Sequence, residues 1–149
     1  GVCGESAHTR WALANALAVL RRLGGDYGLA VVMGAGGDRY RGRRPLMGRA
    51  SVLLADRVIV TSDNPRSEDP GAIIAEIVAG IDAARAEGLP IAPVEVEPDR
   101  RSAIRRAILQ AAPGEVVVIA GKGHEDYQIL GDRRIHFSDI EVAKETLDA

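Results

Sequence analysis

The chain has 149 residues, of which 46% are hydrophobic and 27% charged, and its formal net charge at pH 7 is −2. This length suits one domain with a real core, and the composition is ordinary for a soluble globular protein. The nearly balanced charge and the 3% of aromatic residues argue against a nucleic-acid surface. No apolar run approaches the roughly 18 residues of a spanning helix. We therefore expect no nucleic-acid partner and no membrane partner.

The first residues and the cysteine content predict a cytoplasmic location. The opening sequence, Gly1-Val2-Cys3-Gly4-Glu5, lacks the basic and apolar regions of a secretory signal. Cys3 is the only cysteine, so it cannot form an internal disulfide, which fits a reducing compartment.

Helix and strand patterns alternate along most of the chain. Continuous apolar runs predict buried strands over residues 29–33, 57–62, 91–96 and 115–120, the third of them weakened by Pro93. Apolar residues at helical spacing and capping residues predict helices over residues 9–23, 45–55, 70–87, 99–111 and 138–147. Thr9 is the expected N-cap of the first helix, and Gly24-Gly25 is expected to end it.

The last part of the chain has a different pattern. Two short runs flank Gly131-Asp132 between Tyr127 and Phe137, which predicts a β-hairpin. Ser138 with Glu141 forms a capping box for the final helix. The order of elements predicts a three-layer α/β domain with a mostly parallel sheet and a C-terminal β-hairpin, and residues 1–149 contain no linker that would divide it.

Two polar loops directly follow strand-like runs. They are Asp63-Asn64-Pro65-Arg66 (the 63–66 loop) and Gly121-Lys122-Gly123-His124-Glu125 (the 121–125 loop). In an open parallel sheet, ligands bind beyond the carboxyl ends of the strands. We therefore predict that the two loops form one binding edge.

The residue types in these loops suit a zwitterionic ligand. Pro65 stiffens the first loop, so Arg66 is presented at low entropic cost, and its guanidinium pairs naturally with a carboxylate. The second loop offers backbone N–H groups for an anionic group and Glu125 for a cationic one. The alternatives are a turn with a structural salt bridge at Arg66 and a structural, rather than basic, role for His124.

Other motifs are weaker. The cluster Gly34-Ala35-Gly36-Gly37 lacks the third glycine of a dinucleotide fingerprint, because Arg39 occupies that position, and the chain has no P-loop motif. A basic patch follows, which is either a solvated face or a site for phosphate or carboxylate, and Arg39 is its member nearest the end of the strand. The patch consists of Arg39, Arg41, Arg43, Arg44 and Arg49. We expect no metal site, because the four cysteine and histidine residues lack ligand spacing: Cys3, His8, His124 and His136.

The two loops, with Asp126, Tyr127 and Gln128 after the second, closely resemble the C-terminal domain of the Mur ligase family. The segments 36–39 and 44–48 are similar to that family too, and the match runs from about Ala7 to the C-terminus. This resemblance implies a Rossmann-like third domain of a three-domain ligase. It further implies that a central domain, not contained in this chain, holds ATP and magnesium and activates a carboxylate as an acyl phosphate.

The resemblance also implies the residues that bind the incoming amino acid. The Asn-Pro-Arg sequence of the 63–66 loop is typical of family members that add meso-diaminopimelate to UDP-N-acetylmuramoyl-L-alanyl-D-glutamate. The resemblance implies that neighbouring domains hold this second substrate. No catalytic residue is implied within the chain, which we expect to be inactive in isolation. The implied substrate-binding residues are Arg39, Asp63, Asn64, Pro65, Arg66, Gly121 and Glu125.

One segment departs from the family pattern. Where the family reads Asp-Tyr-Ala-His-Thr-Pro, this chain has Glu5-Ser6-Ala7-His8-Thr9-Arg10. Glu5 and His8 are the implied nucleotide-binding residues, and Glu5 either makes the contact of the family's aspartate with a longer side chain or has lost it.

Two further hypotheses for the function of the chain are a free-standing, non-catalytic binding module and a related ligase domain that adds a different amino acid.

Overall fold

The computed structural model describes residues 2–5, 10–23, 27–122 and 125–149. The described residues form a five-stranded sheet in which every neighbouring pair is parallel, in the order β1-β5-β2-β3-β4. All carboxyl ends therefore lie at one edge, as the sequence predicted for the two loops. The strands are β1 (Val2–Glu5), β2 (Leu29–Met33), β3 (Arg57–Val60), β4 (Val94–Val96) and β5 (Val116–Ala120).

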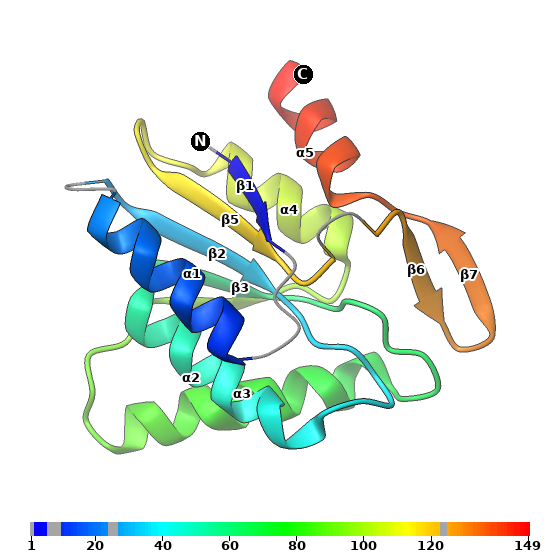
Figure 1. The fold of residues 1–149 in the computed structure, drawn as a ribbon, viewed down its shortest axis with the longest axis horizontal. Coiled ribbons are helices and arrows are strands. Elements are labelled where there is room, and N and C mark those ends of the chain that lie inside the picture. Colours follow the sequence, from blue (N-terminus) through cyan, green and yellow to red (C-terminus); the bar gives the residue numbers. More distant parts are fainter. Residues whose placement is uncertain (1, 6–9, 24–26, 123–124) are drawn as a thin grey trace.

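Helices cover both faces of this sheet and give the predicted three layers (Figure 1). One face carries α1, α2 and α3, with α2 packed against both of the others, and the other face carries α4 and α5. A short 3₁₀ helix, η1 (Arg41–Arg43), leads directly into α2. The α-helices are α1 (Arg10–Leu23), α2 (Arg44–Leu54), α3 (Pro70–Ala86), α4 (Arg100–Leu109) and α5 (Asp139–Asp148).

Each face of the sheet has its own hydrophobic core. Because successive strand side chains point to opposite faces, Val31 packs into the core beneath α1–α3 and Val32 into the core beneath α4 and α5. Leu13, Leu17 and Ile77 are fully buried in the first core. The continuous apolar runs thus reflect burial on both sides.

Several helix starts follow the predicted capping chemistry. The Asp69 side chain accepts a hydrogen bond from the backbone N–H of Ala72 at the start of α3, and the Ser138 side chain accepts one from Glu141 at the start of α5. The expected cap at Thr9 and the glycines at 24 and 25 lie outside the described residues.

The structure differs from the sequence predictions at three strands, and the strand predicted over residues 57–62 ends at Val60. No local pattern predicted β1, which has only four residues, one of them glycine, and forms through its pairing with β5. The strand predicted from residue 91 begins only at Val94, because Pro93 has no N–H to donate to the ladder. The Pro93 carbonyl still accepts a hydrogen bond from Val58 at 3.1 Å.

The predicted hairpin forms a second, two-stranded sheet. It consists of β6 (Tyr127–Leu130) and β7 (Arg133–His136), which pair antiparallel across the Gly131-Asp132 turn. Figure 1 shows the hairpin beyond the carboxyl edge of the main sheet. It is therefore positioned to contact the loops that leave that edge.

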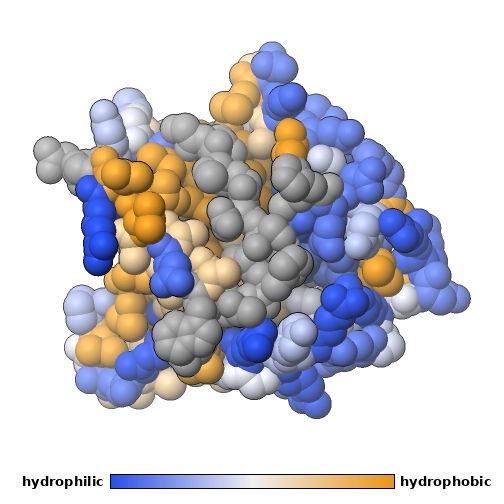
Figure 2. All heavy atoms as spheres, in the orientation of Figure 1, coloured by the Kyte–Doolittle hydropathy of each residue, from blue (hydrophilic) through white to orange (hydrophobic). Residues whose placement is uncertain are grey.

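The surface is largely hydrophilic around the hairpin, whereas hydrophobic residues gather toward the opposite side of the face seen in Figure 2. Exposed apolar side chains near the end of α1 include Val19, Leu23 and Tyr27. Among the described residues, no helix has both the length and the apolar character needed to cross a membrane.

Candidate functional site

Loops from three neighbouring strands enclose a cavity at the carboxyl edge of the sheet. These strands are β5, β2 and β3, and β2 lies between the two strands that carry the predicted binding loops. The cavity has a volume of about 70 Å³, which corresponds to several water-sized groups. The site is thus built from the loop after β2 as well as from the two loops singled out in the sequence.

Six of the seven predicted substrate-binding residues line this cavity, and the seventh does not. Pro65 is buried, and its carbonyl oxygen accepts a hydrogen bond from the backbone of Glu68. A Cβ on Gly37 would lie only 1.8 Å from this oxygen, so Pro65 acts as a packing surface for the loop after β2. The lining residues are Arg39, Asp63, Asn64, Arg66, Gly121 and Glu125.

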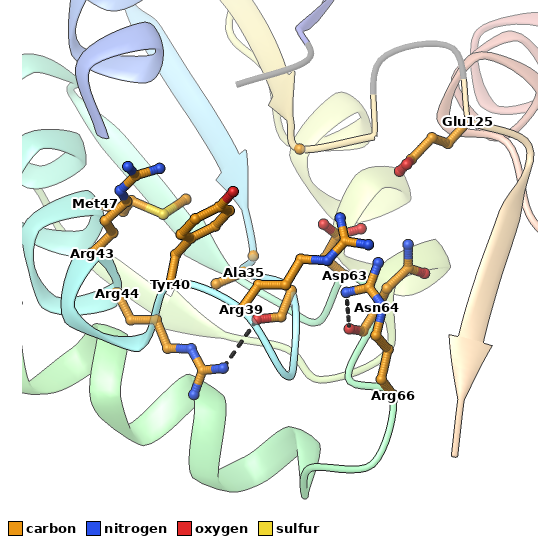
Figure 3. A pocket seen from close by; sticks show the side chains of 13 residues that line it. Ala35, Arg39, Tyr40, Arg43, Arg44, Met47, Asp63, Asn64, Arg66 and Glu125 are labelled. Atoms are coloured by element: carbon orange, nitrogen blue, oxygen red, sulfur yellow. Dashed lines mark hydrogen bonds between the residues drawn. The ribbon is translucent and has the colours of Figure 1, made fainter. Parts of the chain in front are cut away.

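Positive and negative side chains face one space from different loops. Figure 3 shows Arg39 and Arg66 extending toward the region in front of Asp63, while Glu125 points to it from the loop after β5. The Arg66 Nη1 atom donates to the Gly37 carbonyl at 3.0 Å. Glu125 accepts a hydrogen bond from the Tyr127 hydroxyl at 3.1 Å. Both charged groups are therefore held by protein contacts.

The backbone of Arg66 has an uncommon conformation that the hairpin stabilises. Its φ is +53°, in the left-handed region that non-glycine residues seldom adopt. Its N–H donates to the Ile129 carbonyl at 3.1 Å, and its carbonyl accepts from Gly131 at 2.7 Å. The other described non-glycine residues with positive φ, Asp38 and Tyr40, lie in the loop after β2. Such strain concentrates at functional sites.

Asp63 is a buried carboxylate surrounded by cations. Burial raises the pKa of this carboxyl, but the positive charges of Arg100, Lys122 and Arg66 outweigh that effect and hold the pKa below its ordinary value. The Lys122 Nζ atom lies 2.9 Å from Asp63 Oδ1. That oxygen has no well-aligned hydrogen-bond partner among the described residues, so the contact is an ion pair. Asp63 therefore presents a negative charge to the cavity.

The side-chain oxygen of Asn64 is used within the protein. It accepts hydrogen bonds from Lys122 Nζ at 3.0 Å and from the backbone N–H of Ile129 at 2.9 Å. Only an oxygen can accept from both donors, which fixes the orientation of the amide. These two hydrogen bonds do not involve the Nδ2 group of Asn64, which carries two N–H donors.

The basic patch predicted after β2 divides into residues with different roles. Arg44 is buried and donates to Glu68, to Glu76 and to the Gly36 carbonyl, so it anchors the loop to the start of α3. Its guanidinium, with the Asp38 N–H, lowers the pKa of Glu68 to about 2. Three arginines of the patch line the cavity: Arg39, Arg43 and Arg44.

Sequence reasoning did not single out two residues that hold the loops of the site, Lys122 and Arg100. Lys122 is fully buried and contacts the 63–66 loop. Arg100, also fully buried, forms a bidentate ion pair with Asp139 and donates to the carbonyls of Ser62 and Ala120 at 3.0 Å. A signal for Lys122 was present, since it lies between two glycines of a polar loop, but nothing in the sequence distinguishes Arg100 from other arginines of α4.

The implied nucleotide-binding residues are only partly described. Glu5 is the last residue of β1 and pairs in register with Ala120, directly before Gly121. His8 and His124 lie outside the described residues. The chain contains no P-loop motif, so its residues do not fit a complete triphosphate site. The described residues also contain no cluster of three or more potential His, Cys, Asp or Glu ligands for a metal ion.

Comparisons with known proteins give a consistent result. The family model described as Mur ligase, glutamate ligase domain, matches residues 5–123. The UDP-N-acetylmuramoyl-L-alanyl-D-glutamate–2,6-diaminopimelate ligase of Synechococcus elongatus is 56% identical over 141 residues, which cover 94% of this chain and 27% of the relative. The ligase of the same name from Chromobacterium violaceum is 50% identical over 148 residues, which cover 97% of this chain and 28% of the relative.

Solved structures agree with these matches. A structure of a UDP-N-acetylmuramoyl-L-alanyl-D-glutamate–2,6-diaminopimelate ligase superimposes with a TM-score of 0.87 at 43% identity, covering 99% of this chain and 29% of the other. A folylpolyglutamate synthase from Thermotoga maritima, at 21% identity and a TM-score of 0.54, shares the fold. The chain thus spans less than a third of the length of the ligases that it matches. By sequence and by structure, it belongs to the Mur ligase family and carries the glutamate ligase domain.

Proposed function

We propose that the chain is the amino-acid-binding domain of an ATP-dependent ligase that adds meso-diaminopimelate to UDP-N-acetylmuramoyl-L-alanyl-D-glutamate. The main observation in support is that Arg66 and Glu125, opposite in charge and 59 positions apart by their numbers, line the same cavity. The names of the similar full-length ligases support the choice of amino acid.

The charges of the cavity match one end of an amino acid. The guanidinium of Arg66 and the Nδ2 donors of Asn64 suit a carboxylate, and the carboxylates of Asp63 and Glu125 suit an ammonium group. Arg39, which is exposed at the rim, adds positive charge. An α-amino carboxylate fits this pattern.

The same contacts suggest which end of the substrate is bound. An amine held between carboxylates stays protonated and cannot act as a nucleophile. The cavity would therefore bind the amino-acid group that does not react. Diaminopimelate has such a group at each end, so its second amine remains free to attack an activated carboxylate. Lysine lacks the second carboxylate and gives Arg66 no partner at that end.

The other substrates are assigned to the rest of the ligase in this proposal. ATP and magnesium would activate the acceptor carboxylate as an acyl phosphate on the domain that carries the P-loop. Glu5 and His8 would contribute at most a contact to the nucleotide from this chain. The role of the present domain is to bind and orient the incoming amino acid.

The experiment is a kinetic comparison in the full-length ligase. Arg66→Ala should lower kcat/KM for diaminopimelate about 10- to 150-fold, the loss expected for a charged hydrogen bond worth about 1.5–3 kcal/mol. The KM for ATP should be unchanged. Arg85→Ala, which removes an exposed ion pair with Asp82, is the matched control and should have little effect.

Two results would contradict the proposal. One is normal diaminopimelate kinetics in the Arg66→Ala enzyme. The other is a wild-type enzyme that prefers lysine or glutamate when the three amino acids are compared by calorimetry and turnover.

A further inference from the structure

Lys122 has no exposed surface, and three oxygen atoms of the protein surround its ammonium group. Nζ lies 2.9 Å from Asp63 Oδ1, 3.0 Å from Asn64 Oδ1 and 2.9 Å from the backbone carbonyl of Tyr127. Nζ donates hydrogen bonds to two of these oxygens, Asn64 Oδ1 and the Tyr127 carbonyl, and forms an ion pair with Asp63. Because the side chain is fully buried, it is not exposed to a ligand in the cavity.

These contacts connect the two charged sides of the cavity. Asp63 and Asn64 belong to the same short loop as Arg66, whose guanidinium lines the cavity. Tyr127 lies two residues after Glu125, and its hydroxyl donates to the Glu125 carboxylate. The Lys122 ammonium is thus bound at one end to the arginine-bearing loop and at the other to the segment that bears the glutamate.

Burial makes this connection rigid. A buried charge is tolerated only with its partners in place, so movement of either loop away from Nζ would leave a charged group without compensation. Two hydrogen bonds from β6 also hold the 63–66 loop, since the Ile129 backbone N–H donates to the Asn64 side-chain oxygen and Gln128 Nε2 donates to the Asp63 carbonyl at 2.8 Å. The contacts of Nζ and these two bonds together hold the 63–66 loop against the segment that follows Glu125.

We propose that Lys122 is a positioning residue that sets the distance between the Arg66 guanidinium and the Glu125 carboxylate, and so determines how tightly the amino-acid substrate is bound. This inference rests on the proposed function. Lys122 itself would not touch the substrate, because it is fully buried and does not line the cavity.

The test compares two substitutions of Lys122 with a matched control in the full-length ligase. Lys122→Met removes the ammonium, while Asp63 keeps the nearby charges of Arg100 and Arg66. Lys122→Arg keeps the charge but replaces a compact ammonium with a longer, planar group. Arg57→Met is the control, because Arg57 makes a half-buried ion pair with Glu115 at the first residue of β3, the end of the sheet away from the cavity.

The expected result is a selective loss of amino-acid recognition. Both Lys122 variants should raise the KM for diaminopimelate at least tenfold, with the KM for ATP within twofold of wild type. Arg57→Met should lower the melting temperature but leave the KM for diaminopimelate within twofold. A purely structural role for Lys122 would make its variants resemble this control.

Other outcomes overturn the inference. A wild-type KM for diaminopimelate in either folded Lys122 variant would show that the ammonium does not set the site geometry. Failure of both variants to fold would show that Lys122 serves the fold rather than the site. If the wild-type ligase adds a different amino acid, the proposed function fails. The KM values of the Lys122 variants are then measured with that amino acid as the substrate. The failure of the proposed function is therefore distinguishable from the failure of the inference on Lys122.

Discussion

Gly121 shows how a single residue shapes the cavity. Its φ is +122°, a conformation essentially restricted to glycine, and it lies immediately after β5. A Cβ at this position would lie 3.3 Å from Asp63 Oδ2, in the space between the two loops. The absence of a side chain therefore serves both the backbone turn and the approach to Asp63.

Gly121→Ala should lower the free energy of unfolding by about 1–3 kcal/mol, because alanine is strained at this φ. It should also weaken amino-acid binding, since the added methyl group crowds Asp63. Gly88→Ala is a suitable control, because Gly88 has a φ of +76° and a methyl group added there would meet no atom within 4 Å. Denaturant unfolding and amino-acid kinetics of the full-length ligase should show a stability loss in both variants and a raised KM only for Gly121→Ala.

At the scale of elements, Arg100 joins segments that are distant in sequence. It extends from the first turn of α4 to the carbonyls of Ser62 and Ala120 and pairs with Asp139 of α5. It thereby connects the carboxyl ends of β3 and β5, from which the 63–66 loop and the 121–125 loop leave, to the helices on one face. The sheet order alone would not fix the positions of these ends.

Arg100→Met should destabilise the protein by about 3–5 kcal/mol, because the Asp139 carboxylate would be buried without its partner. Adding Asp139→Asn to this variant should recover part of the loss, since an amide is less costly to bury unpaired. Stabilities of both single variants and the double variant give the coupling energy. Strictly additive losses would contradict the assignment of the pair.

The same elements show what the sequence could and could not predict. The strands β2 and β5, the capped helices α3 and α5, and the hairpin were predictable, because apolar runs, caps and turn residues act locally. The four-residue β1 was missed, because its formation depends on pairing with β5. The convergence of Arg66 and Glu125 followed from the parallel-sheet rule, but the bonds of Lys122 and Arg100 depend on side-chain packing that no local pattern specifies.

At the scale of the whole molecule, ion pairs make stability depend on pH. The pKa values of Asp56, Asp63, Glu68 and Glu76 are lowered in the folded protein, chiefly by arginine and lysine partners, against the effect of burial. Carboxyls of this kind contribute stability that is complete above their unfolded pKa values, near 4, and is lost as the pH falls toward the folded values. His136 acts in the opposite sense, because Glu141 raises its pKa.

We therefore expect the free energy of unfolding to fall as the pH decreases from about 4.5 toward 2, the pKa range of Glu68. Glu68→Gln should lower stability at pH 7 and make it less dependent on pH across this range. Denaturant unfolding at a series of pH values, with wild type and variant measured side by side, provides the check. Equal slopes for the two proteins would contradict the role given to Glu68.

The order in which the parts occur along the chain has a consequence for biosynthesis. A nascent polypeptide that ends at Ala120 already contains every strand of the main sheet. It still lacks the backbone groups of Ile129 and Gly131 that hold Arg66, which lie more than 60 positions downstream of it. If the proposed function holds, the amino-acid site would therefore be complete only after the hairpin residues have been synthesised.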